Sequence, residues 1–169
     1  MIFNKKRDLL IVVGGGSLPP SMYDRPHEDE LQPNRDRMEE QVIHYCVAHG
    51  IPIIATCRGM QYINVMFGGK LWYHPKLPVN RTRGVDHQVW LVKEQRNIWV
   101  NNYHSDCIYE EGLASCFEPL AIDRENHVVE AYGSDEMKIL ALQWHPERRF
   151  ETANAYEETR KIILDFIQK

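Results

Sequence analysis

The chain has 169 residues, 43% hydrophobic and 26% charged, an ordinary balance for a folded globular protein. This length fits one domain, which we expect to span residues 1–169. The formal net charge of −4 disfavours nucleic-acid binding, which leaves a basic footprint. No apolar run is long enough to cross a bilayer, and the N-terminal charges lack the order of a signal peptide. We therefore expect a cytoplasmic protein without nucleic-acid or membrane partners.

The first half of the chain alternates apolar runs with helical patterns. Leu9–Val13 predicts a buried strand, and the proline-rich stretch from 17 to 33 predicts an irregular loop. A helix is expected to follow, with Asn34 as its N-cap and Gly50 at its end. Its predicted buried stripe consists of Met38, Val42, Ile43, Tyr45 and Cys46. A second buried strand, 51–55, then leads into a helix over 58–67.

The second half is predicted to be rich in strands, with a final helix over 154–167. A hairpin turn is expected at 124–126. The five candidate strands are 89–92, 98–100, 120–122, 127–131 and 139–142. Because strands and helices alternate in the first half, the chain is expected to be an α/β protein built on a parallel sheet.

The most informative stretch is the junction at Cys57, where a buried strand runs into a helix. A sharp turn of this kind exposes a nucleophile at the carboxyl edge of the sheet, and Gly59 allows close backbone approach. The helix N-terminus would favour a thiolate and a developing oxyanion. The alternative is a buried cysteine that ends a strand. The other cysteines, Cys46, Cys107 and Cys116, lack metal-like spacing and are expected to be small buried hydrophobes.

Two further segments would reach the same edge of the sheet. His145 and Glu147 follow the strand 139–142, so His145 could accept the thiol proton while Glu147 orients its ring. Taken alone, the His145-Pro-Glu147 segment would be more typical of a surface turn than of a catalytic pair. Backbone amides of Gly14–Gly16 could complete an oxyanion hole with the amide of Arg58. The alternatives are a phosphate-binding loop and a plain turn, but a proline-rich segment follows where a phosphate-binding loop would open a helix.

These three segments together resemble the class I glutamine amidotransferase superfamily. More narrowly, the chain is similar to the γ-glutamyl-γ-aminobutyrate hydrolases, peptidase family C26. The resemblance rests on four sequence motifs, Val12-Val-Gly-Gly-Gly-Ser17, Asn34-Arg-Asp36, Cys57-Arg-Gly-Met-Gln61 and Gln143-Trp-His-Pro-Glu-Arg148. The resemblance implies a flavodoxin-like, open, mostly parallel sheet with helices on both faces. It also implies a Cys57–His145–Glu147 triad that hydrolyses a small γ-glutamyl conjugate through a thioester, without a cofactor or metal.

The resemblance also assigns binding roles. Gly15, Gly16 and Arg58 would form the oxyanion hole, and Gln61 would bind the γ-glutamyl portion. The loop of His104, Ser105 and Asp106 would hold the amino-acid end of the substrate, although family members often have His-His-Gln near this position. His74 and His87 are further histidines that could approach the cleft.

The chain departs from the family pattern in two places. Only eight residues precede Leu9, where the family usually has a first strand–helix–strand unit, so the chain is either naturally short or starts upstream. The edge of strand 9–13 would then be bare, and we expect it to be covered by upstream residues, by a second subunit in a homodimer or by the chain's own ends. The segment 84–100 is compact, as in a γ-glutamyl-CDP-amidate hydrolase type.

Three functions therefore remain open: a stand-alone γ-glutamyl hydrolase, a glutaminase subunit that supplies ammonia to a partner synthetase, and a non-catalytic relative. The presence of Cys57, His145 and Glu147 argues against the last, because a decayed site usually loses a member. The Cys-Arg-Gly and His-Pro-Glu-Arg forms favour the first.

Overall fold

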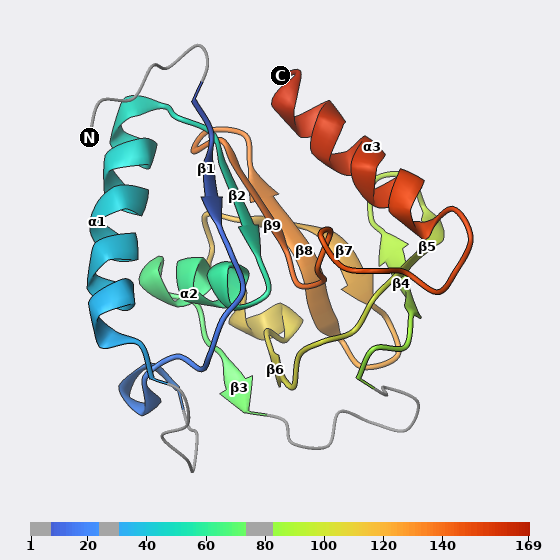
Figure 1. The fold of residues 1–169 in the computed structure, drawn as a ribbon, viewed down its shortest axis with the longest axis horizontal. Helices are drawn as coiled ribbons and strands as arrows, with labels where there is room; N and C mark the ends of the chain where they lie inside the picture. Colours follow the sequence, from blue (N-terminus) through green and yellow to red (C-terminus); the bar gives the residue numbers. More distant parts are fainter. Residues whose placement is uncertain (1–7, 24–30, 74–82) are drawn as a thin grey trace.

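The computed structural model describes residues 8–23, 31–73 and 83–169. Within these ranges a seven-stranded sheet has the order β1-β2-β9-β8-β7-β4-β5, and β3 pairs with β6 in a small second sheet (Figure 1). The strands are β1 (Leu10–Val12), β2 (Ile53–Thr56), β3 (Trp72–Tyr73), β4 (His87–Leu91), β5 (Arg96–Val100), β6 (Asp106–Cys107), β7 (Glu118–Asp123), β8 (Val128–Ser134) and β9 (Ile139–Leu142). The α-helices are α1 (Pro33–His49), α2 (Arg58–Met66) and α3 (Ala155–Ile167), and short 3₁₀ turns occur at Pro20–Met22 and Glu110–Gly112.

The parallel part of the sheet consists of β1, β2 and β9. The register places Ile53 of β2 beside Leu10 of β1 and Ile139 of β9. The other four strands are joined by antiparallel ladders, so that β7 and β5 again run in the direction of β9. The parallel strands therefore end at one common edge, and the α/β fold class expected from the sequence is confirmed.

Helices cover both faces of this sheet, as the resemblance implied (Figure 1). Side chains of β2 alternate between the faces, with Ile53 and Ala55 in the core beneath α1 and α2, and Ile54 in the core beneath α3. On the α3 side, Ile162, Ile163 and Phe166 pack against the second core. The continuous apolar run of β2 thus reflects burial on both sides.

Helix α1 begins earlier than predicted. Gln32 occupies the N-cap position and Pro33 is the first helical residue. A proline fits there because its missing N–H would have no partner in the helix. Asn34 therefore lies inside the first turn, and its assignment as the N-cap was wrong.

The buried face of α1 is also narrower than predicted. Ile43 and Cys46 are buried as expected, but Met38 and Tyr45 are 58% and 40% exposed. Asp36 takes part in the buried face instead, at 6% exposure. Since each residue advances a helix by about 100°, Met38 and Tyr45 lie roughly half a turn away from Asp36.

The predicted strands of the second half are all present, and residues 124–127 form the turn between β7 and β8. The small β3–β6 sheet was not anticipated, because its strands have two residues each. Cys107 is buried, whereas Cys116 is exposed, so the expectation for Cys116 was wrong. None of the helices in the described ranges is long and apolar enough to cross a membrane.

Candidate active site

Cys57 occupies a strained turn between β2 and α2. Its backbone has φ 49° and ψ −110°, a region that residues with a side chain rarely adopt. The Cys57 amide donates to the Leu142 carbonyl at 2.8 Å, which fixes the turn to β9. A Cβ on Gly59 would clash with the Val12 carbonyl oxygen and lie 2.9 Å from Val12 Cγ1. The close approach of β1 therefore requires glycine at position 59.

His145 and Glu147 follow the neighbouring strand β9. His145 Nδ1 lies 2.6 Å from Glu147 Oε1, so this nitrogen carries the proton and Nε2 is left to accept one. A Cβ added to Gly14 would lie 2.8 Å from His145 Cε1 and 3.6 Å from Cys57 Cβ. The imidazole and the cysteine therefore border the same glycine, at the carboxyl edge where β1, β2 and β9 end.

The backbone of His145 is held by Asn101, which directly follows β5. The His145 amide donates to Asn101 Oδ1, and Asn101 Nδ2 donates to the His145 carbonyl oxygen, both at 2.9 Å. Asn101 is fully buried and His145 is 4% exposed. One side chain therefore satisfies both polar backbone groups of the histidine and connects the antiparallel half of the sheet to the site.

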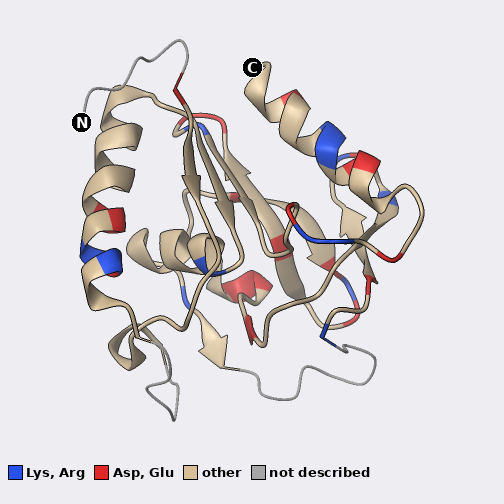
Figure 2. Ribbon diagram, viewed as in Figure 1, with Lys and Arg blue, Asp and Glu red and all other residues tan. Residues whose placement is uncertain are grey.

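A buried charge network fixes the start of α2. The Arg58 guanidinium is 1% exposed and forms ion pairs with Asp36 and, at 2.7 Å, with Glu39 of α1. Figure 2 shows these charges where the first turns of α1 lie beside α2. Burial, followed by the neighbouring charge of Arg35, lowers the pKa of Arg58 to about 10, which still leaves it charged at neutral pH.

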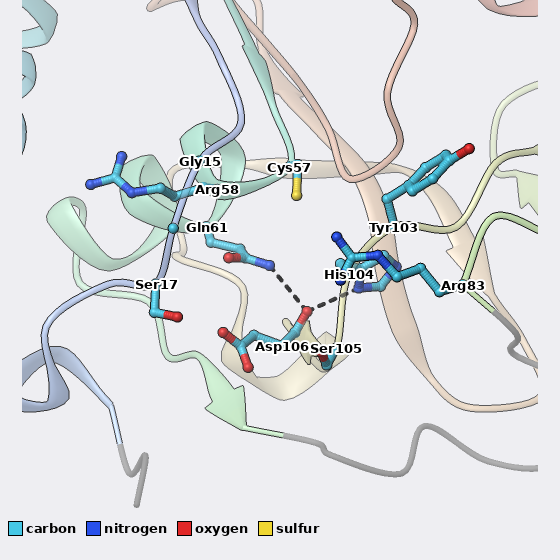
Figure 3. A pocket seen from close by; sticks show the side chains of 11 residues that line it. Gly15, Ser17, Cys57, Arg58, Gln61, Arg83, Tyr103, His104, Ser105 and Asp106 are labelled. Atoms are coloured by element: carbon cyan, nitrogen blue, oxygen red, sulfur yellow. Dashed lines mark hydrogen bonds between the residues drawn. The ribbon is translucent and has the colours of Figure 1, made fainter. Parts of the chain in front are cut away.

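The same helix fixes the glycine loop after β1. Arg35 donates to the carbonyl oxygens of Val13 at 2.6 Å and Gly14 at 3.1 Å. A Cβ on Gly15 would clash with the Arg35 guanidinium. The side chain of Arg58 points away from Cys57 (Figure 3), whereas its backbone amide forms a hydrogen bond with the thiol. Arg35 therefore fixes the backbone of the glycine loop, and Arg58 contributes its own amide at the thiol. These two places supply the peptide groups expected to form the oxyanion hole.

The protonation of this pair differs from the sequence-based expectation. Burial raises the pKa of the Cys57 thiol to about 11, and the Arg58 amide and the charge of Arg148 offset this only in part. The first amide of the helix does lower the thiol pKa, as expected, but desolvation by burial is the larger effect and the net pKa is raised. Burial also lowers the pKa of His145, although the hydrogen bond with Glu147 opposes the shift. The thiol is therefore protonated and the imidazole neutral at neutral pH.

Cys57 opens onto a polar cavity of about 450 Å³ (Figure 3). Eight of the ten residues assigned to the site from the sequence line it, whereas His145 and Glu147 do not. The lining consists of Gly15, Gly16, Ser17, Cys57, Arg58, Gln61, Arg83, Tyr103, His104, Ser105 and Asp106. Tyr103 packs edge-on against the His145 ring, with 5.6 Å between the ring centroids.

The floor of the cavity is organised around one carbonyl oxygen, that of Asp106. It accepts a hydrogen bond from Gln61 Nε2 at 3.0 Å and faces His104 Nδ1 at 3.0 Å (Figure 3). Gln61 Nε2 also donates to Gln143 Oε1 at 3.2 Å, so both amide hydrogens are used. Among the described residues, Gln61 Oε1 has no hydrogen-bond donor and remains available to a ligand.

Several residues that shape the site were not found from the sequence. Asn101 could have been recognised as a site residue because it is a polar residue directly after a predicted strand. Glu130 could have been recognised because it is a charged residue within the apolar stretch of a predicted strand. Arg35 gave no signal beyond its place in a family motif. His87 reaches Glu130, while His74 lies outside the described residues. No cluster of three or more His, Cys, Asp or Glu side chains in the described ranges is arranged to hold a metal ion.

The chain belongs to the Peptidase C26 family, which matches residues 4–147. It is similar to protein NtpR of Enterococcus hirae, at 30% identity over 94% of this chain and 73% of that protein. Similarity to the γ-glutamyl-γ-aminobutyrate hydrolase PuuD of Escherichia coli is 28% over 96% of this chain and 71% of that protein. A solved glutamine amidotransferase from Thermotoga maritima has a TM-score of 0.61 and 20% identity, covering 92% of this chain and 64% of that one. The fold is therefore of the glutamine amidotransferase-like, flavodoxin-like class.

Proposed function

We propose that the chain is a cysteine-dependent hydrolase that cleaves the γ-glutamyl amide bond of a small γ-glutamyl conjugate. The observation that supports this most is the strained turn at Cys57, which borders the same glycine as the Glu147-bound ring of His145. The family and the relative named as a γ-glutamyl-γ-aminobutyrate hydrolase support the choice of bond.

The first half of the reaction would form a thioester. His145 Nε2 takes the proton of the Cys57 thiol as the sulfur attacks the amide carbonyl carbon. The negative charge that develops on the carbonyl oxygen is stabilised by backbone amides of Gly15, Gly16 and Arg58. The C–N bond then breaks, and His145 gives its proton to the departing amine. Because the thiol is protonated at rest, transfer to His145 has to accompany attack.

The second half would release glutamate. Water enters in place of the amine, gives a proton to His145 and attacks the thioester carbonyl carbon. The C–S bond breaks, glutamate leaves, and the proton on His145 returns to the sulfur. Glu147 keeps the ring oriented and stabilises the imidazolium in both halves, as in other triads.

Binding of the substrate would use the polar groups of the cavity. The free Oε1 of Gln61 is an acceptor suited to the α-ammonium of a γ-glutamyl group. Arg83 also lines the cavity and has no ion-pair partner among the described residues. It would suit a carboxylate or another anion on the conjugate.

The test is glutamate release from a panel of γ-glutamyl conjugates with neutral, cationic and anionic amines, together with free glutamine. We expect turnover of at least one conjugate, loss of turnover in Cys57→Ala, and a γ-glutamyl adduct on the Cys57 peptide in mass spectra of quenched reactions. Cys116→Ala is the matched control, because this exposed cysteine is not among the residues that line the cavity. Turnover of glutamine alone would favour the glutaminase alternative, and wild-type turnover by Cys57→Ala would refute the mechanism.

A further inference from the structure

The carboxylate of Glu39 in α1 connects two arginines that lie next to the active site. Its Oε1 accepts a hydrogen bond from Arg35 Nε, and its Oε2 accepts one from Arg58 Nη1, both at 2.7 Å. Because both oxygens face N–H donors, the carboxyl group is ionised and holds both contacts at once. The Glu39 side chain is 12% exposed and is not among the residues that line the cavity, so it acts on the site through its neighbours.

The two guanidinium groups share this carboxylate as a counter-charge. The charge of Arg35 contributes to the lowered pKa of the buried Arg58, after the larger effect of burial, so the two cations are close enough to repel each other. Asp36 pairs with Arg58, and among the described residues Glu39 is the carboxylate that pairs with both arginines. Burial raises the pKa of the Glu39 carboxyl, and the hydrogen bond with Arg35 opposes this shift. Replacing Glu39 by a neutral residue would leave two cations with one carboxylate, an arrangement that a buried site tolerates poorly.

Each arginine also reaches one of the two segments expected to supply the oxyanion hole. Arg35 donates to the carbonyl oxygens of the two residues before Gly15, and also to the uncharged Gln32 Oε1 at 3.0 Å. The Arg58 amide forms a hydrogen bond with the Cys57 thiol. A Cβ on Gly15 would clash with the Arg35 guanidinium and lie 3.2 Å from Arg58 Cδ, so both side chains pack against the glycine loop. Figure 3 shows Gly15 and Arg58 on the same side of the cavity.

We propose that Glu39 is a positioning residue, whose carboxylate fixes the glycine loop and the start of α2 relative to each other. The glycine loop offers the amides of Gly15 and Gly16, and the start of α2 offers the amide of Arg58. A developing oxyanion is stabilised by donors that lie about 3 Å from it, so the separation of these two segments matters as much as the presence of each donor. The effect on catalysis rests on the proposed function, whereas the coupling of the two segments does not.

The first test needs no substrate and measures backbone ¹⁵N order parameters of the Gly15, Gly16 and Arg58 amides by NMR. In Glu39→Gln the order parameters of both segments are expected to fall, because the two arginines then lose their shared counter-charge. Glu40→Gln is the matched control, since the exposed Glu40 is the next residue of α1 and forms no ion pair among the described residues. It is expected to leave all three values unchanged. Unchanged order parameters in Glu39→Gln, or a fall confined to one segment, would overturn the proposal.

The second test is steady-state turnover of the preferred conjugate. In Glu39→Gln, kcat is expected to fall about 100-fold with KM nearly unchanged, because an oxyanion hole acts in the transition state. Glu40→Gln should leave both constants unchanged.

Glu39→Asp separates charge from geometry, because it keeps the negative charge but is one methylene too short to reach both arginines. A similar fall in kcat is expected, and this variant takes the place of Glu39→Gln in both tests if the latter does not fold. Wild-type kcat in either folded variant, or a rise in KM alone, would refute the positioning role. If the wild-type protein turns over no conjugate, the proposed function fails and the order parameters alone decide the coupling.

Discussion

Replacement of Asn101 by alanine tests whether a single side chain holds the proposed catalytic base in place. The substitution removes two hydrogen bonds of 2.9 Å to the amide and carbonyl of His145, at a fully buried position. The His145 carbonyl keeps a hydrogen bond from the Arg148 amide at 3.1 Å, so only the His145 amide is left without a partner. A buried backbone group without a partner costs about 1–3 kcal/mol, and the free energy of unfolding should fall by about this amount. A ring displaced by as little as about 1 Å would also lower kcat about 100-fold.

Urea unfolding measures the stability loss, and glutamate release from the preferred conjugate measures the rate. Asn97→Ala, in β5 just before Asn101, is the matched control, because among the described residues the exposed Asn97 side chain forms a hydrogen bond only with Gln88, at 3.3 Å. It should change the free energy of unfolding by less than about 0.5 kcal/mol. If Asn101→Ala matched the control in both stability and kcat, the inference that Asn101 positions His145 would be refuted.

His145→Ala should lower kcat about 1000-fold or more, and Glu147→Gln should lower it less, because Glu147 acts through orientation; equal losses would contradict that division. Burial lowers the pKa of His145, and the ring must be neutral to accept a proton. The value of kcat/KM should therefore fall with decreasing pH only below the ordinary histidine pKa of about 6.5. A fall in kcat/KM that begins above this pH would contradict the prediction. Gly14→Ala places a methyl carbon 2.8 Å from His145 Cε1. It should lower kcat about 100-fold without lowering the melting temperature. Wild-type turnover would show instead that the ring is free to move. Among the described strands only β2 pairs with β1, and Ile11 is 57% exposed. Slow hydrogen exchange of the Ile11 amide would show that this edge is covered, and fast exchange would contradict the expectation. Light scattering would show whether a homodimer covers it.

Much of the fold could be predicted because its signals are local. Leu10–Val12, Ile53–Thr56 and Ile139–Leu142 are short apolar runs, which is typical of strands buried on both faces. Polar or glycine residues directly after such runs mark the carboxyl edge of a parallel sheet. The positions of Cys57 and His145 at one edge follow from this pattern, and the structure places both beside Gly14.

The errors occurred where a contact distant in sequence decided the outcome. The predicted apolar stripe of α1 failed because Asp36, which pairs with Arg58 of another helix, occupies part of the buried face. At Cys57 the expected local effect of the helix N-terminus is present, but desolvation by burial, which the sequence analysis did not weigh, is larger and raises the thiol pKa. Neither the partner nor the degree of burial can be read from neighbouring residues.

The sequence by itself determined the α/β class, the strained turn at Cys57 and the candidate reacting groups, because each depends on the order of a few adjacent residues. Only the tertiary structure decided the strand order, in which β9 lies between β2 and β8, and so brought Glu130 beneath His104 and Asn101 against His145. Glu130 and His104 are far apart along the chain, and their contact arises from the pairing of antiparallel strands. Such pairing is set by packing of the complete core, and local sequence does not encode it.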